Sequence, residues 1–300
     1  MNDNKLNGDD KYIVFHSEGG QGKQIMATAV IRAIKKAYPD RKIIWVTSWD
    51  GPAFYNPNVF RFYLHGQTQY FKDDYISDNT IIMKHDPYNE TNHILRKEHL
   101  TETWCKMFNV PYDGYLPELY LNPRELEIAK DKIKPDGRPI MLFQSHGGSN
   151  QQYSKKSWYR DMPIEVAQQL VNYFSKKYRI LHIKNPDQPV LQGVEVLSLP
   201  LRELYGVFPL STKRVFIDSF SQHVAAALGL QSTVLWVGNE PKVFGYSEHI
   251  NIFPKSEKVR EFNKHSYLMD DISGFVQQFP YKDINLFDIN EVIRAIESQK

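Results

Sequence analysis

Short apolar runs alternate with amphipathic segments from residue 11 onward. Residues 11–15 (KYIVF) and 42–47 (KIIWVT) are runs typical of buried strands. A glycine-rich turn follows the first run, and Pro39 closes the segment before the second. The segment between them predicts a helix, because its apolar positions recur at helical spacing: Met26, Ala29, Val30, Ala33 and Ala37. Strand, turn, helix and strand in this order predict a parallel βαβ unit.

A second alternation begins after residues 135–139 (PDGRP), whose composition is typical of a linker. The pattern predicts an α/β fold of two Rossmann-like domains, residues 1–137 and 138–300. Ligands of such sheets bind at the carboxyl ends of the strands, here in the cleft expected between the domains. We allow for the last helix packing back on the first domain. Strands are predicted at 81–83, 140–144, 178–183, 214–217 and 233–237, and helices at 94–108, 164–174, 221–228 and 288–298.

Composition narrows the class of protein. The chain has 300 residues, of which 41% are hydrophobic and 24% charged, as in a globular protein rather than a disordered one. No apolar run approaches the ~20 residues that cross a bilayer, and the polar, acidic start is unlike a signal peptide. Cys105 is the single cysteine, which excludes an internal disulfide and a multi-cysteine metal site. We therefore expect a cytoplasmic protein without membrane insertion.

The turn after the first strand, GGQGK, has the features of an anion site. Amide groups at a helix N-terminus bind anions, and Gly20 and Gly22 let a phosphate approach closely. Lys23 lies where the helix dipole disfavours a cation, which a nearby anion would explain. The alternative is a tight turn with a solvated lysine. A P-loop is disfavoured because Ser17 replaces its first glycine and Gln24 its magnesium-binding hydroxyl.

Two loops of the second half carry similar chemistry. Asp218, Ser219, Ser221 and His223 lie between a predicted strand and a helix, which favours an anion site there. A helix cap with a buried histidine is the competing interpretation. The other loop follows the strand at 140–144; it begins with SHGGS at Ser145 and continues to KKSW at 155–158. Its alternative is a solvated surface loop.

In this order, the segments resemble glycosyltransferase family 9, the group that includes the ADP-heptose:lipopolysaccharide heptosyltransferases of GT-B architecture. The resemblance rests on GGQGKQIMATAVIRAIKKAYPDRKIIWVT, on KKSW and on IDSFSQHVAAALGLQSTVLWVGNEP. These segments span residues 13 to 241, most of the chain. The resemblance implies a GT-B fold and an inverting, nucleotide-sugar-dependent glycosyltransferase; similar sequences with GK after the glycines look phage-borne, so the expected host is a bacterium or a phage-infected cell.

Carried over residue by residue, the resemblance implies a donor site in the second half. The Asp218 block and Lys156 would hold the donor diphosphate, and His223 would support that loop. Gly238 would open the next loop near the donor. The first half would bind the acceptor, with its glycine loop facing the reaction centre. The predicted donor-binding residues are Gly20, Gly22, Lys23, Ser145, Lys156, Asp218, Ser219, Ser221, His223 and Gly238.

Two positions depart from the family pattern. Lys23 stands where the family usually has an acidic residue proposed as the catalytic base, and Phe220 replaces a glycine of the phosphate loop. A base must then come from elsewhere. Glu18 is the first candidate, with His16 and Asp50 behind it. A turn residue before Gly51-Pro52 is the other interpretation of Asp50.

Glycosyl transfer requires stabilisation of the departing diphosphate. The chain has no Asp-x-Asp motif, so lysines and helix N-termini are expected to act instead of a magnesium ion. We predict no cofactor and no metal. His85, His93 and His99 fit no familiar ligand spacing and are interpreted as cleft or core residues.

The acceptor stays open between a cell-surface, lipopolysaccharide-type glycan and DNA carrying a hydroxymethylated pyrimidine. Residues 1–137 carry 18 Lys and Arg against 19 Asp and Glu, which argues against a basic DNA-binding domain. Residues 51–72 nevertheless combine seven aromatic residues with two bases and no acid, suited to stacking or to ordinary packing. The predicted acceptor residues are Arg61, Tyr63, His85 and Tyr88. Two other functions stay open: a P-loop-like NTP-binding protein, and an inactive sugar-nucleotide-binding module.

Overall fold

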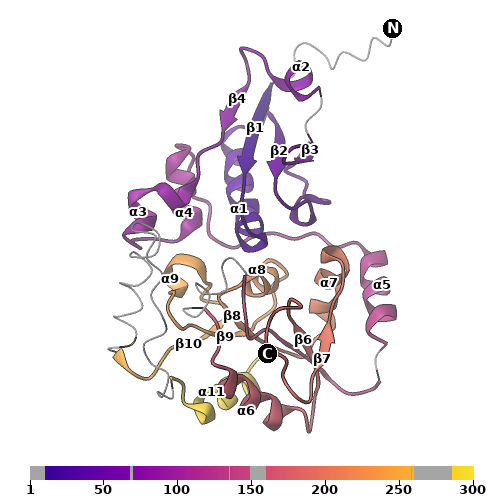
Figure 1. Cartoon of the computed structure of the whole chain (residues 1–300). Coiled ribbons are helices and arrows are strands. Elements are labelled where there is room, and N and C mark those ends of the chain that lie inside the picture. Colours follow the sequence, from indigo (N-terminus) through magenta and orange to yellow (C-terminus); the bar gives the residue numbers. More distant parts are fainter. Residues whose placement is uncertain (1–10, 68–69, 135, 149–159, 258, 260–285) are drawn as a thin grey trace. The chain divides into compact units, whose positions relative to one another are not determined.

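The structure is a computed structural model in which the chain forms two compact units, residues 1–120 and 121–300 (Figure 1). It describes residues 11–67, 70–134, 136–148, 160–257, 259 and 286–300. Each unit contains a parallel sheet with helices, as the alternating pattern predicted.

The sheet of the first unit has the strand order β3-β2-β1-β4, with every neighbouring pair parallel. Its two central strands each contain an apolar, buried run, residues 12–15 of β1 and 43–46 of β2, as expected of strands covered on both faces. The β1–β2 register aligns Phe15 with Trp45, and both side chains are fully buried in the core. The strands are β1 (Tyr12–Ser17), β2 (Lys42–Thr47), β3 (Arg61–Leu64) and β4 (Ile81–Met83).

Helix α1 (Gln21–Ala37) begins within the glycine-rich segment, with Gly20 as its N-cap, and buries its apolar positions against this sheet. The single helix predicted at 94–108 is instead two helices. Arg96 has a φ of +52°, which interrupts the helix, and the His99 imidazole then caps a new one by accepting from the Thr101 amide. The other helices are η1 (Gly51–Ala53), α2 (Phe71–Tyr75), η2 (Pro87–Asn89), α3 (Thr91–Ile94) and α4 (Leu100–Met107).

The second unit has a six-stranded parallel sheet of order β10-β9-β8-β5-β6-β7. The predicted strands are present, and the sequence pattern missed only the short edge strands β7 and β10. Each edge strand has three residues, too few for a periodicity to show. The strands are β5 (Ile140–Phe143), β6 (Arg179–Ile183), β7 (Glu195–Leu197), β8 (Lys213–Ile217), β9 (Thr233–Leu235) and β10 (Ile250–Ile252).

The division between the units lies before helix α5 (Pro123–Ile133), whereas the expected boundary at 137/138 lies after it. The reason is packing against α7 (Leu201–Val207). Gly206 of α7 brings the helices so close that a β-carbon there would lie 2.9 Å from Ala129. The Arg202 guanidinium also pairs with the Glu125 carboxylate at 2.5 Å. The remaining helices are α6 (Ile164–Phe174), η4 (Phe208–Leu210), α8 (Phe220–Ala227), α9 (Pro241–Phe244) and α11 (Ile289–Glu297).

The last helix, α11, packs against α6, β8 and β9 of the second unit. Val292 and Ile296 are fully buried in the core beside α6 and β8. The Gln299 side chain pairs with the backbone at the start of β8: its amide donates to the Arg214 carbonyl at 2.8 Å, and its oxygen accepts from the Arg214 amide at 2.9 Å. These buried bonds fix the end of the chain to this sheet.

Candidate active site

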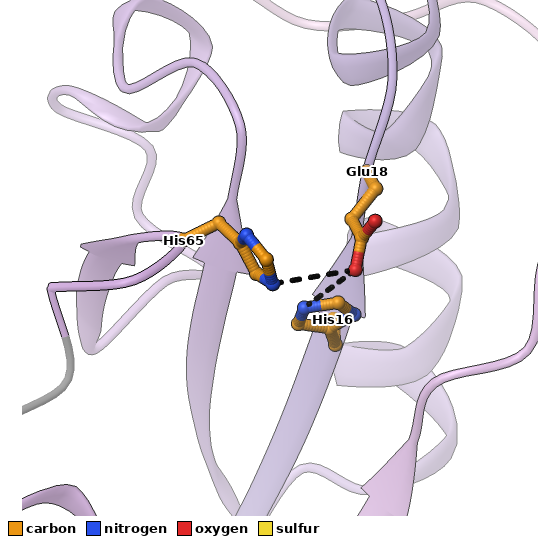
Figure 2. Close-up of side chains that lie close together, drawn as sticks. All are labelled: His16, Glu18 and His65. Carbon is orange, nitrogen blue, oxygen red and sulfur yellow. Dashed lines mark ion pairs between the residues drawn. The ribbon is translucent and has the colours of Figure 1, made fainter.

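Three side chains meet at the carboxyl edge of the first sheet (Figure 2). His16 is the penultimate residue of β1, Glu18 follows that strand directly, and His65 follows β3. Their separation along the chain disappears because parallel strands end at the same edge. The Nε2 atoms of His16 and His65 each lie 3.4 Å from Oε1 of Glu18, and the two rings are 5.3 Å apart.

The loop that carries Glu18 is fixed by the loop after β2. The Gly19 amide donates to Oγ of Ser48 at 3.2 Å, and the Trp49 indole donates to the Gly19 carbonyl at 3.2 Å. Gly19 has a φ of +112°, which side-chain-bearing residues rarely adopt. A β-carbon there would also lie 3.2 Å from Cδ of Lys23. The turn therefore needs glycine at this position.

His65 is fixed through its backbone. Its amide donates to the Thr47 carbonyl at 2.9 Å, which continues the β2–β3 ladder by one residue. The Thr47 hydroxyl donates to Oε1 of the fully buried Gln24 at 2.9 Å, so the end of β2 is tied to the first turn of α1. These hydrogen bonds connect the ends of β2 and β3 to the first turn of α1.

The electrostatics of the cluster favour a neutral His16. Its side chain is 11% exposed, and burial lowers the pKa of the imidazole, although Glu18 opposes the shift. The charges of Lys84, His65 and Lys23 push the His16 pKa in the same direction as burial. Glu18 and His65 are about half exposed, with side-chain exposures of 52% and 56%. The carboxylate is therefore open to a ligand beside a neutral imidazole.

Lys23 has an internal partner. Its ammonium is nearly buried and lies 2.6 Å from Oδ2 of Asp86, 4.6 Å above the Tyr88 ring and 5.6 Å from the Trp104 ring. Burial lowers its pKa, and Asp86 opposes that shift. The ion pair explains a cation in the first turn of α1 without any bound anion. A role of Lys23 in donor binding stays a prediction, as it does for Gly20, the N-cap, and Gly22, in the first turn.

The other residues predicted for the first unit do not join the cluster. Asp50 lies at the N-terminus of η1 and is not one of the three converging side chains. Arg61 and Tyr63, both on β3, bond to the same Tyr75 hydroxyl at 2.6 and 2.8 Å. His85 is exposed after β4, and Tyr88 faces Lys23. These acceptor roles stay predictions.

The second unit has a polar cluster where β8 and β9 end. Asp218 is buried directly after β8; the Asn239 side-chain amide donates to its Oδ2, and the Gln222 side-chain amide donates to its Oδ1 at 3.3 Å. Gln222 also donates to the Phe244 carbonyl at 3.1 Å. The Asp218 carboxylate therefore organises the loops around the start of α8.

The loop after β5 reaches the same point. The Gln144 side-chain amide donates to Oγ of Ser219 at 3.0 Å, which joins the two predicted loops. Ser145 is fully buried instead, with its hydroxyl 2.8 Å from Nδ1 of His146 and 3.0 Å from Nε2 of His182. Its hydroxyl is held by the fold, so burial argues against the predicted contact between Ser145 and a donor.

The remaining donor predictions have different positions. Ser221 is fully buried in α8, and Gly238 is buried in the loop after β9. His223 is buried with Nδ1 2.7 Å from the Tyr246 hydroxyl, an arrangement that suits a supporting role. Lys156, with the rest of KKSW, lies outside the described residues.

Sequence reasoning missed the partners of the predicted residues. Four residues that were not predicted as site residues contact a predicted one: His65, Asp86, Gln222 and Asn239. His65, Asp86 and Asn239 lie in loops distant in sequence from their partners, and Gln222 lies in helix α8. The one available signal for His65 was its place after β3, and that strand was interpreted as part of an aromatic loop.

Comparisons with known proteins fall into two groups. No family model matches the chain, and no curated protein matches its sequence. Solved structures do match. The glycosyl transferase family 9 protein from Veillonella parvula aligns with a TM-score of 0.70 at 14% identity, covering 96% of this chain and 97% of that one.

Two further structures are heptosyltransferases. Escherichia coli ADP-heptose LPS heptosyltransferase II gives a TM-score of 0.59 at 15% identity over 88% of this chain and 99% of its own. The iron-containing dodecameric heptosyltransferase TibC, in complex with ADP-D-beta-D-heptose, gives a TM-score of 0.66 at 13% identity. The alignment covers 96% of this chain and 76% of that one.

At these identities the likeness establishes the fold. It confirms the expected α/β architecture of the GT-B type, and it confirms the resemblance to glycosyltransferase family 9 at that level. Within the described part of the chain, no helix combines the length and the apolar character that a membrane span requires.

Proposed function

We propose that the chain is a glycosyltransferase that moves a sugar from a nucleotide sugar to a hydroxyl of a cell-surface glycan. The observation that carries the proposal is the fold, because the likeness to a family 9 glycosyltransferase extends over 96% of the chain. Fold alone does not fix an activity, so the proposal also needs suitable chemistry in each unit. Both sheets have polar clusters at their carboxyl edges, where ligands of parallel sheets bind.

The second unit is proposed to hold the donor. The N-terminus of α8 carries no side-chain cap, and the donor diphosphate is proposed to bind at its first amides. Asp218 acts through the loop rather than on the diphosphate, because its carboxylate accepts from Asn239 and Gln222 and would repel an anion. Lys156 is proposed to add a positive charge. These groups would stabilise the departing diphosphate without a metal ion.

The first unit is proposed to supply the base, with Glu18 in that role. Its carboxylate removes the proton from the acceptor hydroxyl as the oxygen attacks the anomeric carbon, and the bond to the diphosphate breaks with inversion. The imidazoles of His16 and His65 flank the carboxylate, each with Nε2 3.4 Å from Oε1. Asp86 is a second carboxylate at this edge, but Lys23 occupies its Oδ2.

A glycan acceptor is proposed over modified DNA. Two of the similar structures are heptosyltransferases, one of them named for lipopolysaccharide. Residues 1–137 carry one more acidic than basic residue, which does not suit a duplex-binding domain. The donor would then come from the cytoplasm.

The test is a screen of ADP-, UDP- and GDP-sugars with the full chain in EDTA, measuring nucleoside diphosphate release with and without lipopolysaccharide core acceptors. Acceptor-stimulated release that survives EDTA supports the proposal. Failure to bind any sugar nucleotide overturns it, and donor binding without transfer to a glycan or to hydroxymethylated DNA indicates an inactive module. Magnesium-dependent ATP turnover that Lys23→Ala abolishes would indicate the NTPase alternative.

A further inference from the structure

The separations within the His16, Glu18 and His65 cluster do not fit ordinary hydrogen bonds. Nitrogen–oxygen hydrogen bonds are typically about 2.7–3.2 Å long. Both imidazole Nε2 atoms lie 3.4 Å from Oε1 of Glu18, beyond that range, and they converge on the same oxygen. Two hydrogen bonds from the imidazoles to the Glu18 carboxylate therefore do not explain the arrangement.

The same separations fit ligands around one metal ion. Imidazole nitrogens and carboxylate oxygens bind zinc at about 2.0–2.2 Å, and in a tetrahedral site such ligand atoms are about 3.3–3.6 Å apart. Both nitrogen–oxygen distances of 3.4 Å lie in that interval. The three ligand atoms all lie within 4.8 Å of one another.

The ligand set also selects a class of metal. Two imidazoles and one carboxylate suit zinc and related transition-metal ions, whereas magnesium and calcium prefer oxygen ligands alone. Glu18 and His65 are half exposed, so a fourth position stays open to water or to a bound hydroxyl. The ligands are also held in advance, since the Gly19 and His65 amides are both bonded to the end of β2 or the loop after it.

We propose that His16, Glu18 and His65 form a binding site for one divalent transition-metal ion, with zinc as the reference metal. This inference stands on the cluster itself and holds whether or not the chain transfers a sugar. It has one consequence for the proposed function. A metal-bound Glu18 carboxylate cannot accept the acceptor proton, so zinc should inhibit transfer and EDTA should restore it.

Binding is tested on the full chain after removal of metal with EDTA. Calorimetry with zinc, followed by dialysis and elemental analysis, should give one ion per chain at micromolar affinity, and magnesium should give none. Cobalt should bind the same site and show the absorption of a tetrahedral centre. Absence of zinc binding in the micromolar range would overturn the inference.

The variants locate the site. His65→Ala and Glu18→Gln change half-exposed side chains and should leave the thermal unfolding temperature nearly unchanged, while each weakens zinc binding at least tenfold. His85→Ala, which removes an exposed histidine outside the cluster, should keep full affinity. Equal affinity in all three variants would place the metal elsewhere and refute the assignment.

The two proposals fail separately. Zinc binding without inhibition of transfer would leave the metal site in place and remove Glu18 as the base. Transfer without zinc binding would leave the glycosyltransferase and remove the metal site.

Discussion

At the scale of single residues, Lys23 stands at the position where the resemblance to glycosyltransferase family 9 implies an acidic residue. Lys23 is enclosed by Asp86, Tyr88 and Trp104 and serves the fold. Glu18 lies three residues before the first residue of α1, beside two imidazoles, and its carboxylate is half exposed. The Glu18 carboxylate is therefore more accessible to a substrate than that of Asp86, which is less exposed and paired with Lys23.

Glu18→Gln keeps the size of the side chain and removes the proton acceptor. We expect kcat to fall by roughly 10²- to 10⁴-fold, as for the loss of a general base, with little change in the KM for the donor. Steady-state kinetics in EDTA measure both. Glu90→Gln is the matched control, since Glu90 is an exposed glutamate of the same unit that makes no side-chain cap. A normal rate for Glu18→Gln would show that Glu18 is not the base and would leave Asp86 as the other carboxylate at this edge.

At the scale of elements, two backbone segments approach closely at the candidate site and again at the contact between α5 and α7. The turn between β1 and α1 depends on the left-handed conformation of Gly19. The α5–α7 contact depends on the missing side chain of Gly206. In both places a glycine allows two backbone segments to meet.

Gly19→Ala places a side chain in a strained conformation and within 3.2 Å of Cδ of Lys23. We expect it to lower the free energy of unfolding by about 1–3 kcal/mol. Gly20→Ala is the control, because a β-carbon there meets nothing within 4 Å and the φ is −70°. Its cost should stay under about 1 kcal/mol, the ordinary N-cap preference. Equal losses in urea denaturation of the two variants would contradict the strained turn.

Gly206→Ala distinguishes the observed unit boundary from the expected one by the sign of its effect. In an unpacked helix, alanine in place of glycine stabilises by about 1 kcal/mol. Against α5, the new β-carbon would lie 2.9 Å from the Glu125 carbonyl oxygen and from Ala129, so we expect destabilisation. Differential scanning calorimetry gives the answer, and a raised unfolding temperature would show that α5 does not pack there.

At the scale of the whole molecule, both units bury neutral histidines. His93 of the first unit and His182 and His249 of the second have pKa values lowered by burial to about 4. His249 shows why the neutral form is held: Nδ1 accepts from the Ser232 amide at 3.3 Å, and Nε2 faces the Gln222 carbonyl at 3.0 Å. A second proton would displace the Ser232 amide.

These histidines predict that stability falls as the pH is lowered from 6.5 to about 4.5. The unfolded chain binds protons near a pKa of 6.5 and the folded chain does not, so acid favours unfolding by up to about 1 kcal/mol per pH unit for each histidine. Urea denaturation across this interval measures the slope. His249→Gln should reduce the slope whatever its effect on stability at pH 7. A slope that His249→Gln does not alter would contradict a neutral, buried His249.

The sequence alone determined the alternation of strands and helices, because each buried strand of a parallel sheet is an apolar run and each covering helix shows its own period. It also determined the glycine turn and Glu18, whose place after a strand is local information.

Tertiary structure decided which distant residues complete the site. His65 reaches Glu18 only because β2 lies between β1 and β3 with all ends at one edge, and Lys23 meets Asp86 only because β4 joins the other side of β1. Strand order is set by packing between remote segments, so no pattern within one segment contains it.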